Sequence, residues 1–366
     1  MQEILKIDGS FLEGGGQIVR TALALSSITG KSFEVNNIRK NRPQPGLKAQ
    51  HVHCIKALEQ LCDAKVEGAE IGSETLRFYP GILKAKNLSI DIGTAGSISL
   101  LMQSLLLPCL FMKKSVKLEI TGGTDGKWAM PIDFFNYVFL PQIRIFSNGI
   151  ESNMIKRGYY PKGNGKLSIK FNPLFKLNFA NFDDFFENLS KSNKDYNLTL
   201  QKKLIFIKGV SHASRSLESA NVSERQAKSA KFVLSKYNVP VDIRTEYQDT
   251  LSDGSGIVLW AVFSDKEEFD LNHPMILGSD ILGEKGKKSE AIGEEAGKKL
   301  ILEMESGACV DSHTADSLIP FMGLTPGSKI KTSIITNHCK TNIFVTEKFL
   351  PVKFNINNFI VECKHT

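Results

Sequence analysis

Hydrophobic positions along the chain switch between a two-residue and a helical period in a regular order. Within residues 1–85 the patterns follow one another as strand 3–9, helix 18–30, strand 32–39, helix 47–62 and strands 65–72 and 75–81. The segment 86–177 repeats the order, with helical patterns at 98–111 and 132–147. Each segment therefore predicts a unit of the type βαβαββ.

A third unit is predicted for 276–366. We expect it to contain a strand near Ile276, helices at 290–305 and 313–323, a strand that ends at His338, a helix at 342–350 and a strand at 357–364. Between the second and third units, 179–197 is polar and Asn-rich and predicts a loose connection, while the rest of 178–275 reads as strand, helix, strand, strand. The predicted fold class is α/β (α+β): three repeated βαβαββ units form a large domain (1–177 and 276–366), with a small inserted α/β domain (178–275).

The composition changes this picture little. The 366 residues are 42% hydrophobic and 23% charged, which excludes a disordered chain or a disulfide mini-scaffold. The net charge of +7 allows an acidic partner such as nucleic acid but does not require one. The six cysteines form no CxxC pair, so neither a zinc site nor a disulfide framework is expected.

Neither secretion nor a membrane location is expected. The N-terminus carries charges where a signal peptide needs an apolar run. The longest uncharged stretch, Ser97–Met112, contains Gln103 and Pro108 and is shorter than the roughly 20 residues that span a bilayer. We expect a buried core helix there and an intracellular protein, cytoplasmic or, in a eukaryote, nuclear.

The turn before the first helix is a candidate phosphate site. Glu13 precedes three glycines, and Arg20 lies one helical turn beyond Gln17. Free N–H groups at a helix N-terminus suit phosphate, and a nearby acid suits a divalent metal. An acid that simply favours the helix dipole explains Glu13 equally well. Small-residue turns recur at the matching points of the other units, 93–97 and 306–312.

The segment 38–53 is rich in donors. Arg39 and Arg42 flank the start of a Pro-rich loop, and Gln50 and His51 follow on a helix. Arginine suits forked phosphate contacts, although a solvated basic loop is the usual outcome for a run of charge. His51 and His53 are two residues apart, so they cannot form an i,i+4 metal pair.

The third unit contributes histidines. His313 and Asp316 lie one turn apart and suit a nucleotide contact better than a metal, because no third ligand is nearby; helix capping is the alternative. His338 falls where the other units place Arg39 and the 122–125 turn. A lone histidine is usually structural, but an imidazole in a phosphate-lined site can act as a nucleophile toward phosphorus.

Six motifs in this order together resemble the RNA 3′-terminal phosphate cyclase family. They are DGSFLEGGGQIVRTALALS, IR..R..PGLKAQH, GTAGS....LMQ, GGTD, RGYYPKGNG and H..TNI....FLP. The resemblance covers the chain from end to end, and it implies the three-unit fold with its insert. It also implies ATP-dependent conversion of an RNA 3′-phosphate to a 2′,3′-cyclic phosphodiester, through a covalent histidine-AMP.

The same resemblance assigns roles to individual residues. His338 would be the nucleophile, and Glu13 would hold Mg²⁺ or Mn²⁺. The residues implied for the ATP site are Glu13, Gln17, Arg20, Gln103, Pro131, His313, Asp316 and Ser317. Those implied for the phosphate and RNA end are Arg39, Arg42, Gln50 and His51, with Arg20 beside them. The implied partners are ATP and RNA with a 3′-phosphate end, bound by a monomer or homodimer.

Two positions depart from the family pattern, and two other functions stay open. His313 stands where the family usually has an aromatic residue, often Tyr, and Ser317 stands where it usually has Gln; both concern nucleotide selectivity. The first alternative is a catalytically inactive ribosome-assembly relative of the same fold. The second is an enolpyruvyl transferase, whose architecture also repeats a βαβαββ-type unit. His338, Glu13 and the glycine-rich turns speak against the former, and the RNA-end motifs against the latter.

Overall fold

The computed structural model describes residues 3–366 except 94, 178–181, 267 and 272–273. Its fold is mixed α/β. Three four-stranded sheets have the same strand order, β1-β2-β4-β3, β5-β6-β8-β7 and β9-β14-β16-β15. In each, the first two strands are parallel and the others antiparallel. The repeat predicted from the hydrophobic pattern is therefore present.

The first unit follows the predicted order closely. Its elements are β1 (Leu5–Asp8), α1 (Gln17–Thr29), β2 (Phe33–Asn36), α2 (Ala49–Cys62), β3 (Lys65–Glu67) and β4 (Leu76–Tyr79). Gly30 ends α1 in the left-handed conformation that glycine adopts without strain.

The second unit also keeps its predicted order. Its elements are β5 (Leu88–Asp91), α3 (Ile98–Leu110), β6 (Val116–Gly122), α4 (Ile132–Phe134), the π-turn η1 (Phe135–Phe139), α5 (Leu140–Ile143), the short η2 (Arg144–Phe146), β7 (Ser147–Lys156) and β8 (Gly165–Pro173). Within the predicted turn at 93–97, Thr94 lies outside the described residues. The uncharged stretch forms the buried helix α3, as expected. Among the described residues, no helix is long and apolar enough to cross a bilayer.

The third unit differs from the prediction at its start, and it ends in two strands where one was predicted. Its elements are β9 (Asn197–Leu198), α9 (Ser312–Leu324), β14 (Lys329–Lys331), α10 (Asn337–Phe349), β15 (Val352–Asn357) and β16 (Ile360–His365). The two-residue β9 pairs in parallel with β14 and so opens the unit, in place of the strand expected near Ile276. The segment expected to be a loose connection contains α6 (Phe182–Ser190), whose Phe185 packs edge-on against Phe111; residues 178–181 lie outside the described part.

The insertion interrupts the third unit between β9 and α9. It contains β10 (Lys203–Ser214), η3 (Arg215–Ala220), α7 (Val222–Leu234), β11 (Val241–Gln248), β12 (Ser255–Ser264), β13 (Met275–Leu282) and α8 (Ser289–Glu305). The strand near Ile276 is β13, which pairs with β12 in the sheet β11-β10-β12-β13, and α8 packs on α7. Assigning β13 and α8 to the third unit was therefore wrong. The division of the chain into two domains remains a prediction.

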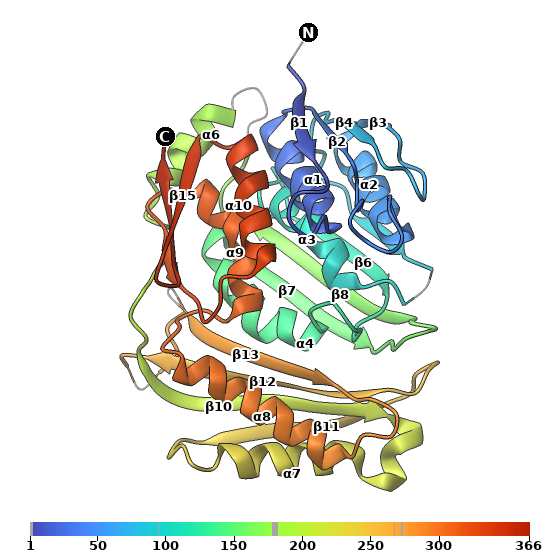
Figure 1. Cartoon of the computed structure of the whole chain (residues 1–366), viewed down its shortest axis with the longest axis vertical. Helices are drawn as coiled ribbons and strands as arrows, with labels where there is room; N and C mark the ends of the chain where they lie inside the picture. The colour runs from blue at the N-terminus through green and yellow to red at the C-terminus, as the bar shows by residue number, and fades with distance from the viewer. Residues whose placement is uncertain (1–2, 94, 178–181, 267, 272–273) are drawn as a thin grey trace.

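Figure 1 shows the three-unit body above and the insertion below, with α7 and α8 on one face of its sheet and the body on the other. In the body, α1 packs against α3 and α10, and α10 packs against α9. Where body and insertion meet, a small apolar cluster forms around Phe134, Val138, Val258 and Trp260. The Trp260 ring stacks on Tyr137 at a centroid distance of 4.7 Å.

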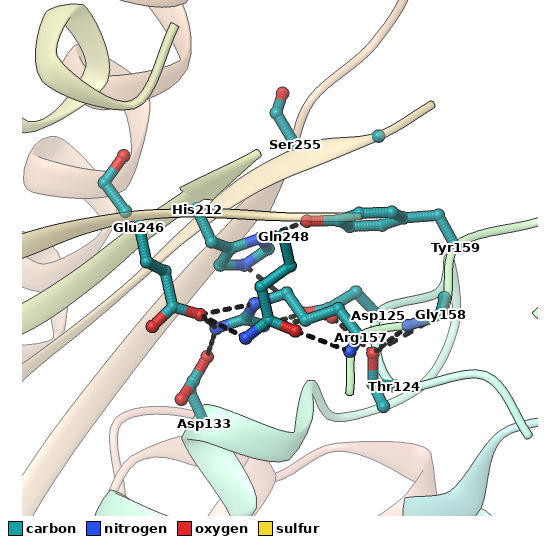
Figure 2. A network of polar contacts seen from close by, with 12 residues as sticks. Thr124, Asp125, Asp133, Arg157, Gly158, Tyr159, His212, Glu246, Gln248 and Ser255 are labelled. Carbon is teal, nitrogen blue, oxygen red and sulfur yellow. Dashed lines mark hydrogen bonds and ion pairs between the residues drawn. The ribbon is translucent and has the colours of Figure 1, made fainter. Parts of the chain in front are cut away.

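Beside this cluster, a buried polar network joins body and insertion (Figure 2). The Arg157 side chain is fully buried and pairs with Asp125, Asp133 and Glu246. Burial disfavours its charge, but these carboxylates outweigh that effect and raise the pKa of Arg157 well above its usual value. Two of the recognised motifs, GGTD and RGYYPKGNG, thus meet here and fasten the insertion to the body.

Candidate active site

Three helix N-termini from two different units lie close together. Gln17 at the start of α1 donates from Nε2 to the backbone carbonyl oxygen of His338 at 3.3 Å. Thr21 Oγ1 donates to Asn342 Oδ1 at 2.7 Å, and Asn342 Nδ2 donates to the carbonyl oxygen of Asp316 at 2.5 Å. Asn342 therefore ties α1, α9 and α10 together, which fixes the side chains mounted on their first turns.

His338 lies in the first turn of α10 and not at the end of a strand, which corrects the sequence prediction. β14 ends at Lys331, and Thr336 begins the helix by accepting the backbone N–H of Cys339 on its Oγ1 at 2.9 Å. The His338 side chain is 47% exposed, and its Nε2 lies 3.9 Å from Glu13 Oε2. Partial burial lowers the pKa of His338. The charge of Glu13 opposes this lowering, whereas the charges of Arg20 and Arg42 lower the pKa further. Its imidazole is therefore neutral near pH 7, with a lone pair available for attack.

Asp316 supports α10 from the neighbouring helix. Thr336 Oγ1 donates to Asp316 Oδ1 at 2.5 Å, so the residue that caps α10 also binds the carboxyl group of α9. Burial raises the pKa of Asp316 from 3.8 to about 7, although the Thr336 hydrogen bond lowers it. Asp316 thus acts on His338 through Thr336, two residues before the imidazole.

The basic residues of 38–53 surround the turn before α1. Arg42 Nη2 donates to Glu13 Oε2 at 2.9 Å, and Arg39 Nη2 donates to the carbonyl oxygen of Gln44 at 3.3 Å. Within the described part of the chain, three buried donors here have no hydrogen-bond partner, the Nε atoms of Arg39 and Arg42 and the Nε2 of Gln50. Buried N–H groups without acceptors are costly, so this arrangement is suited to an anionic ligand.

His51 stands directly under the glycine turn. It is 4% exposed, and its Nδ1 accepts the backbone N–H of Lys48 at 2.9 Å. Burial, with Arg20, Arg39 and Lys48, lowers the pKa of His51 to about 3, so the ring is neutral and carries its proton on Nε2. A Cβ on Gly16 would lie 1.9 Å from this Nε2, which explains the glycine.

Arg20 reaches across to the second unit. Its Nε donates to Gln103 Oε1 on α3 at 2.9 Å. The side chain is almost completely buried, and this burial lowers the pKa of Arg20 to about 10. The guanidinium therefore stays charged at neutral pH and adds a fixed positive charge beside His338 and His51.

The residues implied for the nucleoside lie around α4 and α9. Pro131 is buried and precedes α4, and the Phe134 ring of this helix meets His313 edge-on at a centroid distance of 6.1 Å. Burial lowers the pKa of His313, and the charge of Asp280 opposes this lowering. Lys299 and His338 lower the pKa further, and the effect of His338 indicates that the two histidines are near each other. Ser317 Oγ donates to the His313 carbonyl oxygen at 3.2 Å and lines a small cavity of about 30 Å³ with Gln103 and Asn342.

Glu13 has the chemistry for a divalent metal. Mg²⁺ is commonly held by one or two carboxylates together with substrate phosphates, and Glu13 supplies one such carboxylate beside the anion-suited donors. Among the described residues, a different group has metal-ligand spacing, Asp125, Asp133 and His212. The Arg157 guanidinium pairs with both of its carboxylates and already supplies their positive charge.

Sequence reasoning overlooked Thr21, Thr336 and Asn342. None of them has a chemistry that stands out, and each contributes only by connecting elements distant in sequence. Thr336 could have been recognised as a helix cap, because threonine at this position accepts the backbone N–H of the residue three positions later, Cys339. The β-branched residues before Thr336 favoured a strand instead.

Comparison with known proteins gives one consistent result. The family model described as RNA 3′-terminal phosphate cyclase matches residues 11–356. The RNA 3′-terminal phosphate cyclase of Pyrococcus abyssi is 42% identical over 97% of this chain and 95% of its own length. That of Pyrobaculum aerophilum is 42% identical (96% and 94%), and that of Archaeoglobus fulgidus is 40% identical (98% and 100%). The chain therefore belongs to the RNA 3′-terminal phosphate cyclase family.

Proposed function

We propose that this chain converts the 3′-phosphate of an RNA into a 2′,3′-cyclic phosphodiester at the expense of ATP, with His338 as the nucleophile. The observation that carries the proposal is the surroundings of His338. A neutral imidazole lies 3.9 Å from a carboxylate, beside buried arginine and glutamine donors without acceptors. Such a site suits a nucleophile that attacks phosphorus while fixed donors stabilise the phosphate oxygens.

The reaction has three steps. A ring nitrogen of His338 attacks the α-phosphorus of ATP, so that a P–N bond forms and pyrophosphate leaves. An oxygen of the RNA 3′-phosphate attacks the same phosphorus, the P–N bond breaks, and AMP is joined to the RNA. The 2′-hydroxyl oxygen then attacks the RNA phosphorus, AMP leaves with the bonding electrons, and the hydroxyl proton passes to solvent.

The residues around His338 divide this work. Gln17 and Thr336 hold α10 and thus the imidazole in place, and Asp316 holds Thr336. Arg20, Arg39 and Arg42, with Gln50 and His51, would bind the phosphates of ATP and of the RNA end. Glu13 would hold Mg²⁺, which supplies charge neutralisation on the ATP phosphates.

The adenosine would lie against Pro131 and His313, near Gln103 and Ser317. His313 offers an imidazole in place of a larger aromatic ring, and it already contacts Phe134. An imidazole face stacks on a base as a phenol does, although over a smaller area. A base can therefore still stack at this position, and we propose ATP as the co-substrate.

Incubation with α-labelled ATP and Mg²⁺ tests the nucleophile. We expect an acid-labile AMP adduct in the wild type, absent in His338→Ala and retained in His365→Ala, a matched change at an exposed histidine. Tryptic digestion at neutral pH should locate the adduct in the peptide 332–340, which holds one histidine. That peptide also holds Cys339, so loss of the adduct in Cys339→Ala but not in His338→Ala would refute the assignment.

A second assay addresses the overall reaction. A short RNA with a labelled 3′-phosphate should become resistant to phosphatase when incubated with the wild type and ATP. If the adduct forms but the RNA end stays sensitive, the adenylylation half of the proposal stands and the cyclase half fails.

A further inference from the structure

An exposed tryptophan lies three residues before Pro131, in the loop from β6 to α4. Trp128 is 87% exposed, although large aromatic side chains are usually buried in part. The other tryptophan of the chain, Trp260, is 8% exposed. We propose that Trp128, with Lys127, forms a subsite that stacks on a base of the RNA upstream of its 3′ end; the proposal rests on the cyclase function proposed above.

The loop holds Trp128 outward at a cost. Its φ is +74°, in the left-handed region that a bulky side chain rarely adopts. Such a backbone is costly and persists only where the surrounding structure enforces it. The constraint comes from both ends of the loop: Ile132 N–H donates to the carbonyl oxygen of Thr124 at 3.0 Å, and Ser99 Oγ donates to that of Met130 at 2.6 Å.

The loop is also fixed to the body–insertion junction. Asp125 belongs to the buried Arg157 network, and Thr124 Oγ1 accepts the backbone N–H of Gly158 at 2.9 Å. Trp128 is therefore presented by a supported loop, so the backbone that carries the ring loses little further freedom on binding.

The neighbours of Trp128 favour a nucleic acid over a protein partner. Lys127 Nζ lies 5.3 Å from the indole centroid, and the residues next to this pair in the sequence, Gly126 and Ala129, add little apolar surface to the ring. A single exposed ring with an adjacent cation matches single-stranded RNA, which offers a base face and a phosphate at each nucleotide. Lys127 is 4.0 Å from Glu284, a distance that leaves this exposed cation free to turn toward a phosphate.

The position relative to the site fits a nucleotide near the reacting end. Three residues span at most about 11 Å, so Trp128 lies within that distance of the Pro131 backbone, where the adenosine is proposed to bind. Because the adenosine and the RNA 3′-phosphate must meet at His338, the RNA chain has to leave past the walls of this same site. We infer that Trp128 stands on one such wall.

Kinetics of two variants test the subsite. Trp128→Ala should raise KM for a 3′-phosphate RNA about 5- to 150-fold, the range that corresponds to loss of one aromatic–base stack, with kcat changed less than twofold. Trp128→Phe should recover most of this affinity because it keeps an aromatic face. Phe232→Ala, a change at an 81%-exposed ring on α7, serves as the matched control and should leave KM unchanged. An unchanged KM for RNA in Trp128→Ala, or a raised KM for ATP instead, would overturn the proposal.

Fluorescence tests binding without turnover. In Trp260→Phe the emission comes from Trp128 alone, and titration with 3′-phosphate RNA should quench it, whereas RNA made abasic at the second and third positions should quench less. If Trp260→Phe fails to fold, acrylamide quenching of the wild type gives the same information, because the exposed indole is the accessible one. Equal quenching by both RNAs would refute base stacking. A wild type that shows base-dependent quenching but no cyclisation would keep the subsite and refute the proposed activity.

Discussion

Replacing Gly16 by alanine should disturb the site through a single contact, the one with His51. Gly16 has φ −62° and ψ −8°, a conformation that alanine adopts without strain. The added Cβ, however, would lie 1.9 Å from His51 Nε2 and 2.7 Å from its Cε1. The ring has little room to withdraw, because it is buried and its Nδ1 is bonded to the backbone of Lys48.

The size of the effect follows from two opposing terms. Overpacking of a buried site costs about 1–3 kcal/mol, and alanine in place of glycine at a compatible backbone position gains about 0.4–1 kcal/mol by restricting the unfolded chain. We expect Gly16→Ala to lower the free energy of unfolding by about 1–2 kcal/mol. In a His51→Ala background the clash is absent, so the same change should raise that free energy by about 0.4–1 kcal/mol.

A double-mutant cycle measures this coupling. Urea unfolding of the wild type, both single variants and the double variant gives the interaction between the two positions, expected at about 1–3 kcal/mol. Adenylylation by Gly16→Ala should fall, because the Nε2–H of His51 is displaced from the turn that would bind phosphate. If Gly16→Ala costs as much without the His51 ring as with it, the contact is not the reason for the glycine, and the placement of His51 is refuted.

Four further outcomes are expected. Thr336→Ala should cost about 1 kcal/mol of stability in urea unfolding and slow adenylylation, whereas Thr336→Ser, which keeps the hydroxyl, should do neither; equal losses in both would refute the capping role. Burial raises the pKa of Asp316 from 3.8 to about 7, so the folded state binds the proton of this carboxyl group more tightly than the unfolded state does. The free energy of unfolding should therefore fall as the pH rises from about 4 to 7. Asp316→Asn should remove part of this fall, measured as the difference between the urea midpoints at pH 5 and pH 8. Arg157→Met should cost about 3–5 kcal/mol in the same assay, since it leaves carboxylates buried without a cation. Because the pKa of His338 lies below its usual value of 6.5 and Glu13 opposes that lowering, the adenylylation rate should be flat above pH 7, and Glu13→Gln should move its acidic limb to lower pH.

The repeat was predictable because each unit carries its own change of hydrophobic period. The errors arose where pairing partners decide the outcome. β9 has two residues, too few to show any period, and it opens the third unit only because β14 lies beside it. β13 has an ordinary strand pattern, and nothing in that pattern says which of two sheets it joins.

The local structure around His338 could not be predicted from residue type. The structure brings Glu13 and Arg42 into contact and places His338 beside them, and the roles of these residues remain proposals. The predicted strand ending at His338 followed from the β-branched run at 332–336. Among the residues that the structure describes, this segment pairs with no strand beyond the bridge at Thr332, so the helix cap at Thr336 determines where α10 begins and His338 lies.

The loop after the second strand has a different task in each of the three units. In the second unit this loop connects the insertion to the candidate active site. In the first unit the loop after the second strand carries Arg39 and Arg42, and in the third the corresponding segment leads into His338. In the second unit the corresponding residues, Thr124 and Asp125, belong to the Arg157 network (Figure 2), and the stretch that follows them carries Trp128, the proposed RNA subsite. A change at Arg157 should therefore act at a distance. Under conditions where Arg157→Met is still folded, its KM for RNA should rise together with that of Trp128→Ala, because the loop that carries the indole loses its anchor. An unchanged KM in a folded Arg157→Met would show that the loop is held by its backbone hydrogen bonds alone.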